Sequence, residues 1–131
     1  MTAMLHQSTN QRDFFRLSLP EVPGTLRVIE IGGRPITTEP KPCQLIDASG
    51  SGLCLICQED LPIRKGVVAL FEFELLQVQF AFRGTFVRKV DDLQKFEYGV
   101  RFVDIDERPQ GQLVSVLGRL QVARHRGVGV L

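Results

Sequence analysis

The sequence predicts a mainly β protein: a six-stranded antiparallel β-barrel with one C-terminal α-helix. First, large apolar residues recur at every second position in several short runs, as in Phe71, Phe73 and Leu75, which is the period of a half-buried strand. Second, short turns separate these runs and leave no room for crossover helices, so neighbouring strands are expected to pair antiparallel and close into a small barrel. Third, only the C-terminal region changes to a helical period.

The expected strands lie between turns that are rich in glycine, proline and charged residues. They cover residues 25–31, 43–47, 53–59, 67–76, 78–90 and 96–105. Gly32 and Gly33 follow the first strand directly and give a hairpin signal. Two prolines in residues 36–42 suit an edge or a loop better than a central strand.

The expected helix covers residues 109–124. Four apolar residues fall at i, i+3, i+4 and i+7 and are expected to form its buried face: Leu113, Val116, Leu117 and Leu120. An acidic residue at 106 or 107 followed by Pro109 favours the start, and glycines after residue 126 favour the end. Gly111 and Gly118 each weaken a helix by about 1 kcal/mol relative to alanine, so this helix is expected to depend on docking against the barrel.

Length and composition are those of one soluble globular domain, with 131 residues, 44% hydrophobic and 24% charged. A net charge of +1 argues against binding of duplex nucleic acid. The three cysteines and the lack of a signal peptide favour a reducing, cytoplasmic location. The most apolar run, residues 67–82, contains two glutamates and is short for a membrane span, so no membrane insertion is expected.

The domain organisation follows from the same patterns. Residues 1–11 are polar and lack periodicity, so they are expected to form a flexible N-terminal arm. Residues 12–126 are expected to form the barrel domain with its C-terminal helix, and residues 127–131 a flexible tail.

The sequence offers little support for catalysis or for a metal site. Neither His6 nor His125 has a neighbouring nucleophile and carboxylate, so we expect no enzyme and no catalytic residue. Cys54 and Cys57 spell C-x-x-C, but residues three apart on a strand point to opposite faces. A zinc site would also need a second pair of ligands. We therefore expect buried, inert cysteines, with no metal and no cofactor.

Two short motifs carry the most specific signal. Arg12 and Arg16 form R-x-x-x-R around Phe14 and Phe15, but twelve arginines make about one such pair expected by chance. A simpler interpretation is a solvated pair of charges beside two aromatic rings that pack on the barrel mouth.

The second motif is D-x-S-x-x-G, formed by Asp47, Ser49 and Gly52 between two expected strands. It should arise by accident in roughly three chains in a hundred. Its simpler interpretation is a hairpin turn in which Asp47 and Ser49 cap backbone amides. That local role is compatible with ligand binding.

In this order, ahead of and inside a six-strand pattern, the two motifs resemble the paired signature of the PilZ domain, a bacterial receptor for cyclic di-GMP. Residues 98–106 are similar to the last strand of that family, and the resemblance covers about residues 11–122. It implies a PilZ-type, split-barrel-like fold. One departure is Gln11, where many relatives have a further arginine.

The resemblance implies that cyclic di-GMP is the ligand and that five residues bind it: Arg12, Arg16, Asp47, Ser49 and Gly52. Weaker candidates are Gln11, Ala48 and Gly99. The chemistry is suitable because an arginine fork grips phosphate or the O6/N7 edge of guanine, and its face stacks on a purine. A carboxylate accepts from guanine N–H groups, and glycine lets the backbone approach closely.

The implied function is a receptor that changes conformation on binding and regulates a downstream partner protein in motility, exopolysaccharide or biofilm control. One alternative is a PilZ-fold adaptor that binds proteins but no nucleotide. A more distant alternative is a β-barrel that binds single-stranded nucleic acid. That alternative would need stacking aromatics and a basic groove, whereas the chain has no tryptophan, one tyrosine and near-neutral charge.

Overall fold

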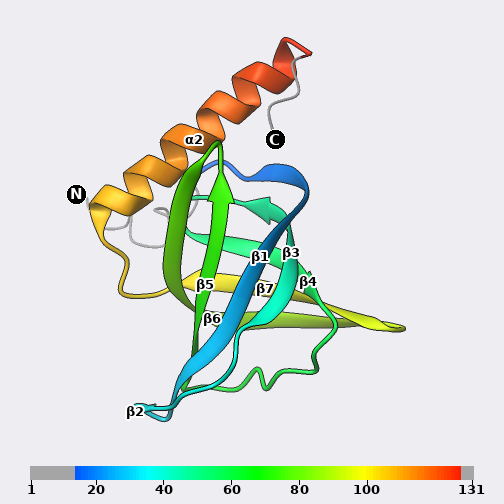
Figure 1. Ribbon diagram of the computed structural model, residues 1–131, viewed down its shortest axis with the longest axis vertical. Helices are drawn as coiled ribbons and strands as arrows, with labels where there is room; N and C mark the ends of the chain where they lie inside the picture. The colour runs from blue at the N-terminus through cyan, green and yellow to red at the C-terminus, as the bar shows by residue number, and fades with distance from the viewer. Residues whose placement is uncertain (1–13, 128–131) are drawn as a thin grey trace, which may run out of the picture.

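The computed structural model describes residues 14–127 and contains seven strands and one helix (Figure 1). In chain order they are β1 (Leu17–Ile31), β2 (Arg34–Pro35), β3 (Lys41–Ala48), β4 (Gly52–Cys57), β5 (Val67–Leu75), β6 (Val78–Asp92), β7 (Lys95–Phe102) and α2 (Glu107–His125). The arm expected over residues 1–11 and most of the tail expected over residues 127–131 lie outside the described residues.

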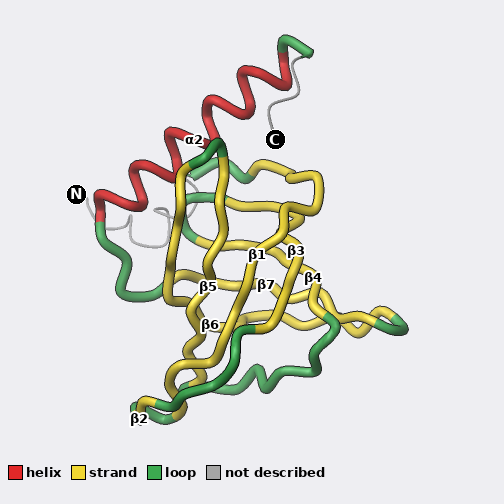
Figure 2. The backbone as a smooth tube through the Cα atoms, viewed as in Figure 1, coloured by secondary structure: helices red, strands yellow, loops and turns green. Residues whose placement is uncertain are grey.

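All strand pairs are antiparallel, and the sheet closes on itself. The strand order is β2-β1-β3-β4-β7-β6-β5, and pairing of β1 with β5 completes the barrel (Figure 2). Six strands form the barrel, while β2 pairs with β1 outside it. The predicted fold class, a six-stranded antiparallel barrel with a C-terminal helix, is confirmed.

The first strand is longer than the sequence predicted, because it begins at Leu17 and not at residue 25. Its first part pairs with β3, but the register shifts between Ser18 and Val22, and Glu21 has a φ of 54°. Pro20 lies within this irregular segment. A bulge interrupts the period-2 pattern from which strands are recognised, so the alternation was hidden in the sequence.

Aromatic side chains from β5, β6 and β7 pack against one another inside the barrel, among many aliphatic core residues. Phe82 stacks on Phe102 with ring centroids 4.5 Å apart, and Phe73 stacks on Phe80 at 5.5 Å. Tyr98 is fully buried, and its hydroxyl donates to the Glu59 carbonyl at 2.6 Å and accepts from the Leu61 amide at 2.8 Å. These rings bury large areas, and the one phenolic group is hydrogen-bonded, so the barrel has a well-packed core without an unpaired hydroxyl.

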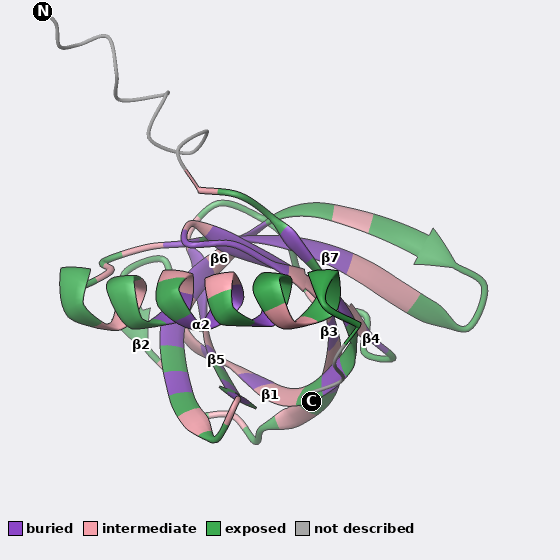
Figure 3. Ribbon diagram, turned by 90° about the horizontal axis from the view of Figure 1, so that it is seen from above, coloured by how far each residue is buried: buried purple, intermediate pink, exposed green. Residues whose placement is uncertain are grey.

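Helix α2 lies across one end of the barrel, as Figures 1 and 3 show from two directions. The four residues of its predicted buried face are buried, and its observed bounds lie within two residues of the predicted ones. The Gln110 amide donates to the Gly50 carbonyl at 2.8 Å, and the Arg124 guanidinium donates to the Ser18 carbonyl at 2.7 Å. The helix is therefore attached both to the β3–β4 turn and to the start of β1.

The cysteines are buried and free, as the sequence predicted. Cys57 belongs to the core inside the barrel, whereas Cys54 lies on the outer face of β4, so the two do point to opposite sides. Burial raises the pKa of the Cys43 thiol to about 12. Such a thiol stays protonated at neutral pH and is a poor nucleophile. Within residues 14–127, no helix is long and apolar enough to cross a membrane.

Candidate functional site

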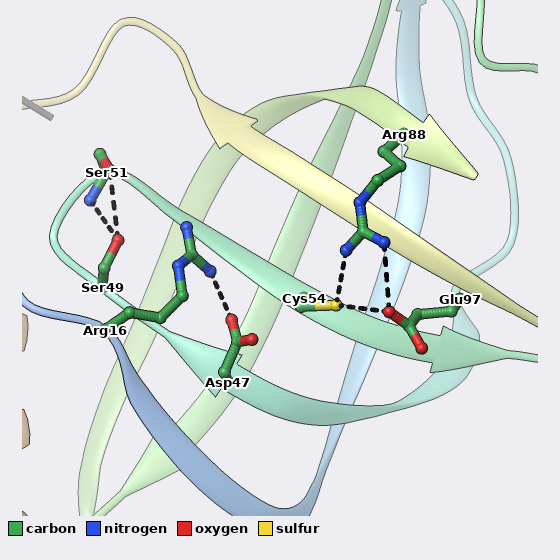
Figure 4. Close-up of polar contacts among 7 residues, drawn as sticks. All are labelled: Arg16, Asp47, Ser49, Ser51, Cys54, Arg88 and Glu97. Carbon is green, nitrogen blue, oxygen red and sulfur yellow. Dashed lines mark hydrogen bonds and ion pairs between the residues drawn. The ribbon is translucent and has the colours of Figure 1, made fainter. Parts of the chain in front are cut away.

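The turn between β3 and β4 carries the D-x-S-x-x-G motif and is held by its own serine. The Ser49 amide donates to the Gly52 carbonyl at 2.9 Å, and the Ser49 hydroxyl accepts from the Ser51 amide at 3.1 Å. Ser49 is 2% exposed, and its hydroxyl also lies 3.2 Å from that of Ser51 (Figure 4). Ser49 therefore caps the turn, as the simpler interpretation of the motif proposed.

Two glycines fit this turn because its surroundings leave no room for a side chain. A Cβ at Gly52 would collide with the carbonyl of Val100 on β7, with 3.2 Å to the carbonyl carbon. A Cβ at Gly50 would lie 2.7 Å from the Phe14 ring and 2.8 Å from Val114 on α2. The turn is thus enclosed by β7, α2 and the segment that precedes β1.

Arg16 lies just before β1 and forms an ion pair with Asp47, on the last part of β3 (Figure 4). The two residues are 31 positions apart in the sequence. The Arg16 side chain is 49% exposed and the Asp47 side chain 24%, so both are open to solvent at the outer surface of the barrel. The structure brings one arginine of the first motif together with the carboxylate of the second.

The remaining predicted site residues have different positions. Arg12 and Gln11 lie outside the described residues. Ala48 is fully buried in the core, so its side chain is not accessible at the surface near the turn. Gly99 lies on β7 opposite Cys54 of β4, on the outer face of the barrel and not at the turn itself.

Sequence reasoning named Asp47 and Gly99 but missed Arg88, which lies in the same row of residues across the outer face. In register, Asp47 of β3 lies opposite Cys54 of β4, Cys54 opposite Gly99 of β7, and Gly99 opposite Arg88 of β6. The Arg88 guanidinium donates to the Cys54 sulfur at 3.3 Å and to the carboxylate of Glu97 at 3.4 Å. No motif signals Arg88, because its position depends on strand register and on a bulge between Phe86 and Arg88.

This face combines a neutral thiol with several guanidinium groups. Burial, together with the nearby negative charges of Asp47 and Glu97, raises the pKa of the Cys54 thiol to about 11, so it is neutral at pH 7. Arg101 is exposed two positions from Gly99 on β7, and within residues 14–127 it has no ion-pair partner. With Arg16 and Arg88, it gives the face three guanidinium groups, which can bind phosphates and stack on planar rings.

Comparison with known proteins identifies the family of this chain. The profile of the PilZ domain matches residues 10–119, a range that includes both motifs. The chain belongs to the PilZ domain family. The resemblance seen in the sequence is thus confirmed. No curated protein matches the sequence.

Solved structures similar to this PilZ domain share its fold at low sequence identity. The Bacillus subtilis inhibitor of motility, MotI/DgrA, has a TM-score of 0.69 and 15% identity over 88% of this chain and 53% of that chain. Escherichia coli YcgR in complex with c-di-GMP has a TM-score of 0.65 and 16% identity over 89% and 49%. The PilZ domain of E. coli YcgR with c-di-GMP has a TM-score of 0.62 and 18% identity over 89% of this chain and 97% of that chain. The chain thus spans about half the length of the first two.

Proposed function

We propose that this PilZ domain is a cytoplasmic, non-catalytic bacterial receptor for cyclic di-GMP that regulates a partner protein. The observation that carries the proposal is the meeting of Arg16 with Asp47 beside the turn of Ser49 and Gly52, because residues far apart in sequence form one exposed cationic and carboxylate site. Two of the similar solved structures contain c-di-GMP. Family membership supports the same ligand.

Binding exchanges one set of polar partners for another. In the free protein, the Arg16 guanidinium is paired with Asp47. An exposed ion pair of this kind stabilises a fold by at most about 1 kcal/mol. A phosphate or the O6/N7 edge of guanine offers the guanidinium a bidentate partner, and guanine N–H groups can donate to the released carboxylate. Both groups remain satisfied after the exchange, so opening the pair opposes binding only weakly.

The position of the turn supports an output through α2. Gly50 accepts a hydrogen bond from Gln110 and is covered by Phe14 and Val114, so a ligand that displaces the turn also displaces the N-terminal part of the helix. A change in the helix surface would be the signal to a partner protein. Control of motility, exopolysaccharide synthesis or biofilm formation is the proposed outcome, and one similar structure is named as an inhibitor of motility.

Calorimetric titration tests the proposal. We expect cyclic di-GMP to bind, with cyclic di-AMP, GTP and GMP far weaker. Adenine presents an N6 donor where guanine presents the O6 acceptor, so arginine loses its bidentate partner at a cost of about 1–3 kcal/mol per base. Equal affinities for the two cyclic dinucleotides would contradict the proposed base recognition.

Arg16→Ala is the matching variant, and Arg34→Ala is its control. Arg16→Ala should reduce affinity by about 2–3 kcal/mol, the contribution of a charge-assisted hydrogen bond, with little change in the melting temperature. Arg34 is exposed on β2, and Figure 1 places β2 at the end of the barrel opposite α2, so its removal should leave affinity unchanged. If Arg16→Ala unfolds the protein but spares the affinity of the folded fraction, Arg16 is structural.

A further inference from the structure

The Arg88 side chain lies close to the backbone of residue 99, and the glycine at that position leaves room for it. Gly99 has no positive φ, so its backbone conformation does not require glycine. A Cβ there would lie 3.3 Å from both Cβ and Nε of Arg88, tighter than an ordinary contact. The Arg88 side chain can therefore lie flat over β7 and direct its guanidinium toward Cys54 of β4 (Figure 4).

The contacts that hold Arg88 are weak ones. A neutral thiol is a poor hydrogen-bond acceptor, and the contact to Glu97 is long, at 3.4 Å. The Arg88 side chain remains 52% exposed. Ion pairs of this exposure add at most about 1 kcal/mol to stability. The guanidinium thus keeps free N–H donors and an open planar face, although its position is defined.

Arg88 and Arg16 approach the same strip of the outer surface from opposite sides, as Figure 4 shows. The row Asp47–Cys54–Gly99–Arg88 crosses four adjacent strands, β3, β4, β7 and β6. Three strand spacings place its two ends about 14 Å apart. Between them lie a buried thiol and a glycine, so no large side chain of the row itself separates the two guanidinium groups.

We infer that Arg88, which packs against Gly99, is a second ligand-binding group of this site. It contacts the half of the dinucleotide that Arg16 and Asp47 do not contact. The inference rests on the proposed function. A cyclic dinucleotide has two phosphates and two guanines, and one placed along the row presents one half to each end. Arg88 can grip a phosphate or a guanine edge with its fork, or stack on a purine with its face. Glu97 is then the anion that the ligand displaces, as Asp47 is at Arg16.

The test is calorimetric titration of cyclic di-GMP into four variants: Arg88→Ala, Arg88→Lys, Glu97→Gln and the distant control Arg34→Ala. Arg88→Ala should weaken binding by about tenfold or more, as expected for loss of a charge-assisted contact. Arg88→Lys should restore only part of the affinity, because lysine keeps the charge but lacks the fork and the flat face. Glu97→Gln should strengthen binding by about twofold, since it removes the competing carboxylate.

If the ion pair between Arg88 and Glu97 only stabilises the fold, the expected result differs. Glu97→Gln then lowers the melting temperature and gives no gain in affinity. If Arg88→Ala stays folded and binds within about twofold of the wild type, while Arg16→Ala loses affinity as proposed above, the inference is overturned and the proposed function stands. If the wild type itself does not bind cyclic di-GMP, both are overturned.

Discussion

Two turns of this protein contain a pair of glycines, and the reasons for glycine differ completely. Gly32 and Gly33, which join β1 to β2, have φ values of 59° and 82°, and a Cβ on either would meet nothing within 4 Å. Gly50 and Gly52, in the turn between β3 and β4, have no positive φ, but a Cβ on either would collide with neighbouring atoms. The first pair is required by backbone conformation and the second by lack of space.

The difference separates a turn with open space around its glycines from a turn that is packed against several parts of the protein. The Gly32–Gly33 turn has solvent where side chains would be. The β3–β4 turn is packed against the carbonyl of Val100, the Phe14 ring and Val114 of α2, and it also carries Ser49 of the candidate site. Substitution by alanine should therefore act through backbone strain at the Gly32–Gly33 turn and through packing at the β3–β4 turn.

Gly52→Ala should have the largest effect. Its Cβ would meet the backbone oxygen of Val100, and a backbone atom paired in a sheet cannot move aside as a side chain can. We expect a loss of about 3 kcal/mol in the free energy of unfolding, measured by urea denaturation. A loss no greater than that of Gly33→Ala would show that the β4–β7 pair is more deformable than its register indicates.

Gly50→Ala should have an intermediate effect, about 2 kcal/mol, because the obstructing atoms belong to side chains. The Phe14 ring is only partly buried and can shift. A double-mutant cycle with Phe14→Ala measures the coupling directly, since removal of the ring should recover part of the loss. Strict additivity of the two changes would mean that Phe14 does not limit the space at Gly50.

Gly33→Ala should have the smallest cost, about 1 kcal/mol, from the left-handed backbone conformation alone, and it should not change affinity for cyclic di-GMP. Gly111→Ala is its control, because Gly111 lies in α2 with open space and no positive φ. That variant should gain up to about 1 kcal/mol in urea denaturation. A gain at Gly33 as well would remove backbone conformation as the explanation for this turn.

The sequence predicted those parts of the fold that have a regular period. Alternation in β5 and β6 was sufficient to predict the strands, and the four apolar residues of α2 were sufficient to predict the helix. Both motifs of the family are contiguous patterns that can be read directly in the sequence. The start of β1 was missed because Pro20 and the bulge near Glu21 break the alternation. Arg88 was missed for another reason: its place beside Cys54 depends on pairing between strands that are distant in sequence, which local patterns do not encode.

The pairing of Arg16 with Asp47 and of Arg88 with Glu97 has a consequence for the way the domain responds to ionic strength. Anion binding to a bare cationic surface releases bound counterions and weakens steeply as salt rises. Here each arginine is already paired with a carboxylate of the same chain. In the proposed complex, a phosphate of the ligand displaces that carboxylate. Added salt screens the old pair and the new one alike. The affinity for the proposed ligand should therefore vary with salt less than the number of arginine–phosphate contacts implies, so that occupancy follows the concentration of that ligand more than the ionic strength.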